Sequence, residues 1–101
     1  MRFMLTRMLP TGDVSTQSMA NAMEIPLRTF QRRLKENKIS YKNLVEETRK
    51  SSTLEYMAND AFSLNEIAFL VGYSESTNFF RAFKSWTGVS PVEYRTKHFA
   101  L

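Results

Sequence analysis

Residues 63–95 read SLNEIAFLVGYSESTNFFRAFKSWTGVSPVEYR and contain the strongest helix-start signal in the chain. Its first four residues have the pattern of a capping box, in which Ser63 accepts from a first-turn amide and Glu66 reaches back to the serine amide. Apolar residues follow at helical spacing until Gly72, which is typical of a helix C-terminus. The pattern therefore predicts a short helix with a defined start and a defined end.

A second helix follows after a tight turn. Phe79 and Phe83 lie four residues apart, which places both on one face of this helix. Gly88 ends the helix, and Ser90 begins a last short helix that we expect to run through Tyr94. Two helices joined by a tight turn, with an apolar stripe on the second, are typical of a helix-turn-helix unit.

The same unit occurs a second time, upstream. Ala20 recurs 48 residues later as Ala68, and Ile25 recurs at the same interval as Tyr73. Four further residues recur 49 positions later, so the second turn holds one extra residue. These pairs are Phe30 with Phe79, Arg32 with Arg81, Leu34 with Phe83, and Lys35 with Lys84. The repeat predicts two helix-turn-helix units in one chain.

Between the two units, Ser40 opens a segment through Met57 that contains no Gly or Pro. Apolar and small residues recur in it at helical spacing, which predicts one helix of about five turns. Upstream, residues 2–9 predict a short helix, and Ser15 or Thr16 caps the next one. No alternating strand pattern competes with these helices.

The fold class expected is therefore all-α, with two helix-turn-helix subdomains joined by a long linker helix and about seven helices in total. We place the first unit at about residues 1–39, the linker helix at about residues 40–59 and the second unit at about residues 62–97.

The composition is that of a globular domain and excludes several kinds of chemistry. A chain of 101 residues, of which 43% are hydrophobic, can bury one modest core. The lack of cysteine excludes disulfides, thiolate zinc sites and a cysteine nucleophile. His98 is the only histidine, and no metal-ligand cluster or glycine-rich phosphate loop appears, so we expect no enzyme, no metal and no cofactor. No apolar run approaches the ~20 residues that span a bilayer, so we expect a cytoplasmic protein without membrane contact.

Positive charge is concentrated in one segment. The chain carries a formal charge of +4 and has a pI near 9.6. Residues 28–38 hold five basic residues against Glu36 alone, so this segment accounts for the whole excess. A basic patch suits a polyanionic partner. The alternative is a solvated helix face, since basic residues commonly lie opposite an apolar stripe.

On each second helix, the face opposite the apolar stripe is suited to the major groove of DNA. Arginine can bind guanine through two acceptors and glutamine can bind adenine likewise, at roughly 1–3 kcal/mol of discrimination for each pair. The expected base-contacting residues are Arg28, Gln31 and Arg32 in the first unit and Ser76, Thr77, Phe80 and Arg81 in the second. The expected phosphate contacts are Arg33, Lys35, Lys38, Lys84 and the helix starts at Ser40 and Ser90. The aromatic residues expected in the core are Phe30, Phe79, Phe83 and Trp86.

Together these residues resemble the AraC/XylS family of bacterial transcription regulators. The resemblance covers residues 15–95 and is densest in residues 63–95. It rests there on Glu66-Ile67-Ala68, Gly72-Tyr73-Ser74, Asn78-Phe79, Arg81-Ala82-Phe83-Lys84, Trp86, Gly88, Ser90-Pro91 and Tyr94-Arg95. The first unit is similar through residues 28–34, Ser40-Tyr41 and Leu44.

The resemblance implies a seven-helix, two-lobed domain that reads successive major-groove faces about one helical turn apart, with the long helix as spacer. It implies that the isolated domain binds as a monomer, whereas full-length members can be dimeric. The family's base-contacting places fall on the seven base-contacting residues given above. This sequence departs from the family at Glu24, where glycine is frequent, and at Phe80, where a small hydroxyl residue is common.

The resemblance also implies an N-terminal sensing domain, so we expect this chain to be a fragment of a longer regulator. It further implies RNA polymerase as a partner and activation of transcription. Two other interpretations stay open: a helical protein-interaction module whose basic face docks an acidic partner, and a binder of structured RNA. Selective binding to duplex DNA separates them, because the deep, narrow major groove of RNA does not admit a reading helix.

Overall fold

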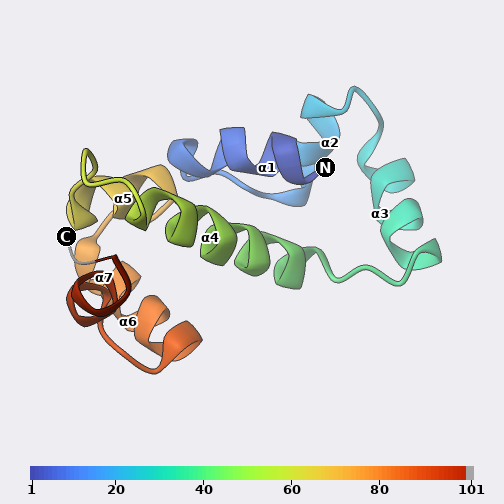
Figure 1. Cartoon of the computed structure of the whole chain (residues 1–101). Helices are drawn as coiled ribbons and strands as arrows, with labels where there is room; N and C mark the ends of the chain where they lie inside the picture. Colours follow the sequence, from blue (N-terminus) through green and yellow to red (C-terminus); the bar gives the residue numbers. More distant parts are fainter. Residues whose placement is uncertain (100–101) are drawn as a thin grey trace.

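Eight helical segments make up residues 1–99, the part of the chain that the computed structural model describes (Figure 1). They are α1 (Arg2–Met8), the 3-10 helix η1 (Leu9–Thr11), α2 (Thr16–Ala22), α3 (Leu27–Glu36), α4 (Tyr41–Met57), α5 (Leu64–Leu70), α6 (Ser76–Thr87) and α7 (Pro91–Phe99). The all-α class with seven α-helices is confirmed. One boundary was wrong, because α7 continues past Tyr94 to Phe99. Within residues 1–99, no helix combines the length and the apolar character needed to cross a membrane.

Four helices begin at a serine whose hydroxyl caps the first turn. The Ser15, Ser40, Ser63 and Ser90 side chains each accept from the backbone amide three residues later. At α5 the capping box is complete, because the Glu66 carboxylate also accepts from the Ser63 amide at 3.0 Å. These bonds satisfy donors that a helix start otherwise leaves free, which fixes where each of the four helices begins.

The buried side chains form two clusters along an elongated molecule of 45 × 23 × 20 Å. The first cluster is centred on Phe30 and also contains buried residues of α1, α2, α3 and α4. The second is centred on Phe79 and Phe83 and draws on α4, α5 and α6. Helix α4 contributes Val45 to the first and Met57 to the second. In Figure 1, α4 therefore runs between the two ends, with α3 at one end and α6 and α7 at the other.

The N-terminal segment contacts both clusters. Leu5 of α1 is buried in the first cluster, whereas Leu9, four residues later, is buried in the second. The Leu9 carbonyl lies against the backbone of Gly72, where an added Cβ atom would come within 2.9 Å of the oxygen. Helix α1 lies along α4 and η1 packs against α5, so this segment forms a second connection between the two ends of the molecule (Figure 1).

Candidate nucleic-acid interface

The turn in each helix-turn-helix unit has the same backbone geometry. The turn after α2 holds Glu24 in the left-handed conformation, φ +58°, and the turn after α5 holds Gly72 in it, φ +99°. The Ile25 amide donates to the Ala20 carbonyl at 3.1 Å, and the residues 48 positions later form the same bond at 2.9 Å. In each turn, the left-handed residue also donates to the carbonyl three residues before it, at 3.0 Å. Both turns are therefore Schellman motifs, and the internal repeat is confirmed at the level of the backbone.

Helix α3 separates an apolar side from a basic side. Phe30 and Leu34 are buried, and the Phe30 ring packs edge-on against Tyr41 of α4 at 5.6 Å between centroids. The side chains expected to read bases are exposed on the opposite side: Arg28, Gln31 and Arg32. Lys35 shares that side by helical spacing, whereas Arg33 is turned ~100° from Arg32. Aromatic packing on one side thus fixes which side chains α3 presents to solvent.

Arg32 is not free in this structure. Its Nε lies 3.6 Å from a carboxylate oxygen of Glu36, one helical turn away, and both side chains are 63% exposed. An exposed pair of this kind contributes little to stability. The guanidinium can therefore leave Glu36 for another acceptor at small cost.

Helix α6 presents a narrower polar face. Phe79 and Phe83 are fully buried, and Thr77 and Arg81 are exposed on the other side. Phe80 is only half-buried, because its ring packs at 5.9 Å from that of Phe79. Two of the four expected readers of this unit, Thr77 and Arg81, are therefore fully presented to solvent.

Ser76, the first residue of α6, is held by a contact that the sequence did not predict. Its hydroxyl donates to the Asn65 side-chain oxygen of α5 at 2.7 Å. This bond links the two helices of the second unit, and it leaves the serine oxygen as an acceptor only. Nothing in the sequence pattern pairs these two positions, since they are eleven residues apart and lie on different helices.

The expected phosphate contacts fall into two groups. Arg33, Lys35, Lys38 and Lys84 have exposed side chains, and Lys38 adopts the left-handed conformation just after α3, φ +54°. Ser40 and Ser90, by contrast, use their hydroxyls as helix caps. At these two serines, only the remaining first-turn amides are left to bind an anion.

Helices α3 and α6, which carry the residues expected to read bases, start differently from the four serine-capped helices. Pro26 precedes α3 and Glu75 precedes α6, and neither position provides a side-chain cap. The first-turn amides of α3 and α6 are therefore left without a side-chain partner. The sequence could have shown that α3 starts without a cap, because the proline ring at position 26 has no hydrogen-bonding group. The first-turn amides of α3 were nevertheless not among the groups predicted to bind phosphate.

Two ionisable groups near the turns have shifted pKa values. Burial raises the pKa of the Tyr73 phenol, and the nearby Glu46 carboxylate raises it further, partly opposed by Arg49. Tyr73 therefore stays neutral and packs as an aromatic group beside the α5–α6 turn. At the start of α2, hydrogen bonds from the Ser18 hydroxyl and the Ser15 amide lower the pKa of Asp13, which keeps this carboxylate charged beside the helix start.

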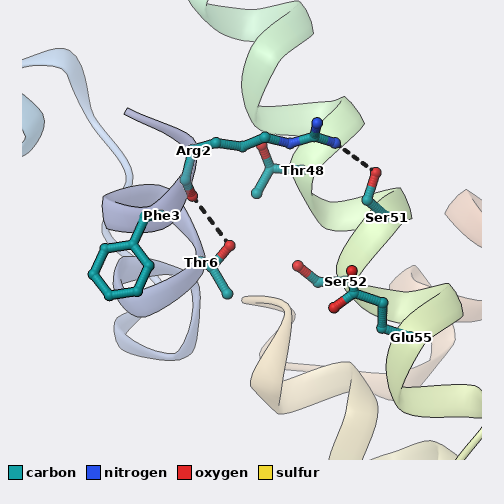
Figure 2. A pocket seen from close by; sticks show the side chains of 7 residues that line it. All are labelled: Arg2, Phe3, Thr6, Thr48, Ser51, Ser52 and Glu55. Atoms are coloured by element: carbon teal, nitrogen blue, oxygen red, sulfur yellow. Dashed lines mark hydrogen bonds between the residues drawn. The ribbon is translucent and has the colours of Figure 1, made fainter.

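A polar cleft of about 370 Å³ lies between α1 and α4, away from both reading faces (Figure 2). Across it, the Arg2 guanidinium donates to the Ser51 hydroxyl at 2.7 Å. Its lining consists of Arg2, Phe3, Thr6, Thr48, Ser51, Ser52 and Glu55. Within residues 1–99, no group of three or more histidine or carboxylate side chains is arranged to hold a metal ion.

Comparison with known proteins places this architecture among DNA-binding domains. A family profile described as a helix-turn-helix domain matches residues 19–97. The HTH-type transcriptional regulator VirS of Mycobacterium tuberculosis is 36% identical over 89 residues, covering 88% of this chain and 26% of that protein. The ornithine utilization regulator of Pseudomonas aeruginosa is 38% identical over 68 residues, covering 67% of this chain and 20% of that protein.

Solved structures agree with this. The C-terminal domain of AraT, a response regulator from Geobacillus stearothermophilus, superimposes with a TM-score of 0.78 at 27% identity, covering 97% of this chain and 82% of that one. A DNA-binding transcriptional dual regulator from Escherichia coli K-12 shares the fold with a TM-score of 0.77, covering 95% of this chain and 89% of that one. The chain belongs to the AraC-type helix-turn-helix family of DNA-binding transcription regulators, which are not enzymes.

Proposed function

We propose that this chain binds duplex DNA by placing α3 and α6 in two successive major grooves on one side of the helix. The observation that carries the proposal is that the same turn and the same second helix occur twice, at opposite ends of α4. Two reading helices one DNA turn apart need a span of about 34–36 Å, and the molecule is 45 Å long.

In this proposal, Arg28, Gln31 and Arg32 read bases in the first box, and Thr77 and Arg81 read the second together with the half-buried Ser76 and Phe80. Phosphates are bound by Arg33, Lys35, Lys38 and Lys84, and by first-turn amides of the helices that begin after Ser40 and Ser90. The uncapped starts of α3 and α6 add donors of the kind that anions bind. We expect the second box to be read less selectively, because fewer of its readers are fully exposed.

We further propose that the domain acts in the cytoplasm as part of a longer transcription activator, with an N-terminal sensing domain and with RNA polymerase as a partner. The chain covers only 26% and 20% of the lengths of the two curated relatives described above, which supports the proposal that this domain is one part of a longer protein. The isolated domain is proposed to bind as a monomer, because both reading helices lie on one chain.

Selection of bound sequences from a random duplex pool, at near-physiological salt, tests the proposal directly. Enrichment of an asymmetric site with two boxes about one helical turn apart is the expected result. A pool that stays random while binding persists would leave only non-specific electrostatic attraction. A pool without binding would favour the protein-interaction module with an acidic partner.

Two neighbouring arginines provide a matched test of the assigned roles, since they differ mainly in the direction they face. Arg32→Ala should relax the preference at one base pair and cost about 1–3 kcal/mol on the selected site. Arg33→Ala should weaken binding to every sequence alike and lower the salt slope by about one. If both variants change specific and random DNA equally, the assignment of base reading to Arg32 is wrong.

A further inference from the structure

The second helix-turn-helix unit is joined to the end of α4 by an arginine from the last helix. Arg95 of α7 donates through Nε to the Met57 carbonyl at 3.2 Å and through a terminal nitrogen to the Asn59 carbonyl at 3.0 Å. Both carbonyls lie where α4 ends and where backbone acceptors lack helical partners. A guanidinium donates in fixed directions, so two such bonds restrict its orientation as well as its distance.

A second arginine, in the middle of α4, contacts the second helix-turn-helix unit. The Arg49 guanidinium lies over the Tyr73 ring at 5.3 Å, and Glu46 holds it from the same helix at 3.0 Å. Its Nε and one terminal nitrogen lie 3.7 Å from where a Cβ atom on Gly72 would be. Arg49 therefore packs directly on the turn that leads into α6.

The Arg49 contact includes a polar group that gains nothing from burial. Within the described residues, its Nε is buried without a hydrogen-bond partner. A buried donor without a partner lowers stability. The ion pair with Glu46 and the contact with the Tyr73 ring hold the guanidinium in this position.

The Arg49 and Arg95 contacts lie at different positions along the axis of α4. Residue 49 and the helix end at residue 57 are eight residues apart, which is ~12 Å along a helix axis. The buried cluster around Met57 already attaches the second unit to the end of α4, and two polar contacts separated along the axis add resistance to rotation about the helix. We infer that Arg49 and Arg95 are positioning residues that set the spacing between the two DNA boxes without contacting DNA.

This inference rests on the proposed two-box binding. Inserting one base pair between the boxes rotates one box by roughly 35° relative to the other and moves it ~3.4 Å. A protein whose two units are held at a fixed spacing can bind both boxes after such a change only if the protein or the DNA deforms. Loosening either arginine contact should therefore make the protein tolerant of altered spacing.

The experiment measures the affinity of the 101-residue chain for duplexes with the selected spacing and with one or two base pairs added or removed. The variants are Arg49→Lys and Arg95→Lys, which keep the charge but lose the planar, two-directional donor. Arg7→Lys is the matched control, since Arg7 is exposed on α1 and its guanidinium likewise lies over an aromatic ring, that of Phe3. Duplexes that carry each box alone report on single-unit binding, and circular dichroism reports on folding.

Wild type and the Arg7 variant should lose about 10-fold in affinity for a one-base-pair change, whereas each positioning variant should lose only about threefold. Affinity for single boxes should stay unchanged. If both positioning variants depend on spacing as wild type does, the positioning role is overturned while the proposed two-box binding stands. If either variant loses affinity for single boxes, the positioning role is also overturned, because the arginines then serve general folding. If wild type itself shows no dependence on spacing, the proposed function fails as well.

Discussion

Replacing Glu24 by glycine should stabilise the domain. Glu24 holds the left-handed conformation, φ +58°, that closes the first helix-turn-helix turn. For a residue with a side chain, this conformation costs about 1–2 kcal/mol. Glycine removes that cost but gains freedom in the unfolded chain, which offsets about 0.4–1 kcal/mol. The net expectation for Glu24→Gly is a gain between about 0 and 1.6 kcal/mol, and its midpoint of about 0.8 kcal/mol corresponds to ~3–6 °C in Tm for a domain of this size.

Urea and thermal unfolding followed by circular dichroism measure this difference. Glu24→Ala is the matched control, because alanine removes the carboxylate but keeps the Cβ atom that strains the turn. Alanine should leave stability within about 0.5 kcal/mol of wild type, the range usual for a surface change. If the glycine variant is no more stable than the alanine variant, backbone strain at this turn does not limit stability and the reasoning is refuted.

Three further changes have defined expectations. Gly72→Ala should lower stability by roughly 2–3 kcal/mol or more, because φ is +99° and the new Cβ atom would meet the Leu9 carbonyl at 2.9 Å; an unchanged urea midpoint would show that η1 moves aside. Phe83→Ala should cost about 3–5 kcal/mol, since the ring is fully buried, and retained thermal stability would contradict its place in the core. The Ser63 amide and hydroxyl lower the pKa of Glu66 below its ordinary value of 4.5, so this carboxylate stabilises the fold above that pH and stops doing so as pH falls through its folded pKa. Glu66→Gln keeps an acceptor but does not titrate, so its Tm should lie below that of wild type at about pH 6 and the gap should narrow as the pH falls below the ordinary value of 4.5; a constant gap would exclude this role.

The helix boundaries were predictable where their causes are local. Each of these local signals lies within four residues of sequence: the Ser63–Glu66 capping box, the glycine after α5 and the serines at helix starts. The sequence pattern alone therefore indicates where these helices begin or end. The repeat was visible because both units need the same small alanine and the same aromatic or aliphatic stripe. The candidate reading faces followed from these stripes alone.

What the sequence missed depends on contacts between distant segments. Leu9 belongs by sequence to the first unit, yet it is buried in the second cluster, because η1 passes beside Gly72. Helix α7 continues past its predicted end because no Gly or Pro follows Tyr94 and because His98 and Phe99 pack against the Tyr94 ring. Arg49 and Arg95 gave no signal of their contacts, since spacing along a helix says nothing about the partner across it.

Side-chain caps are present on some helices and absent from others. The four serine-capped helices, α2, α4, α5 and α7, satisfy a first-turn amide with a side chain, whereas α1, α3 and α6 do not. A side-chain cap on α3 or α6 would stabilise that helix by about 1 kcal/mol, but it would occupy a donor at the helix end that we propose enters the groove. The tight turns held by Glu24 and Gly72 supply the needed alternative, because they fix the start of each reading helix from the preceding helix. In the proposed DNA complex, the uncapped starts of α3 and α6 would therefore stay open to a phosphate while the turns hold each helix in a single orientation.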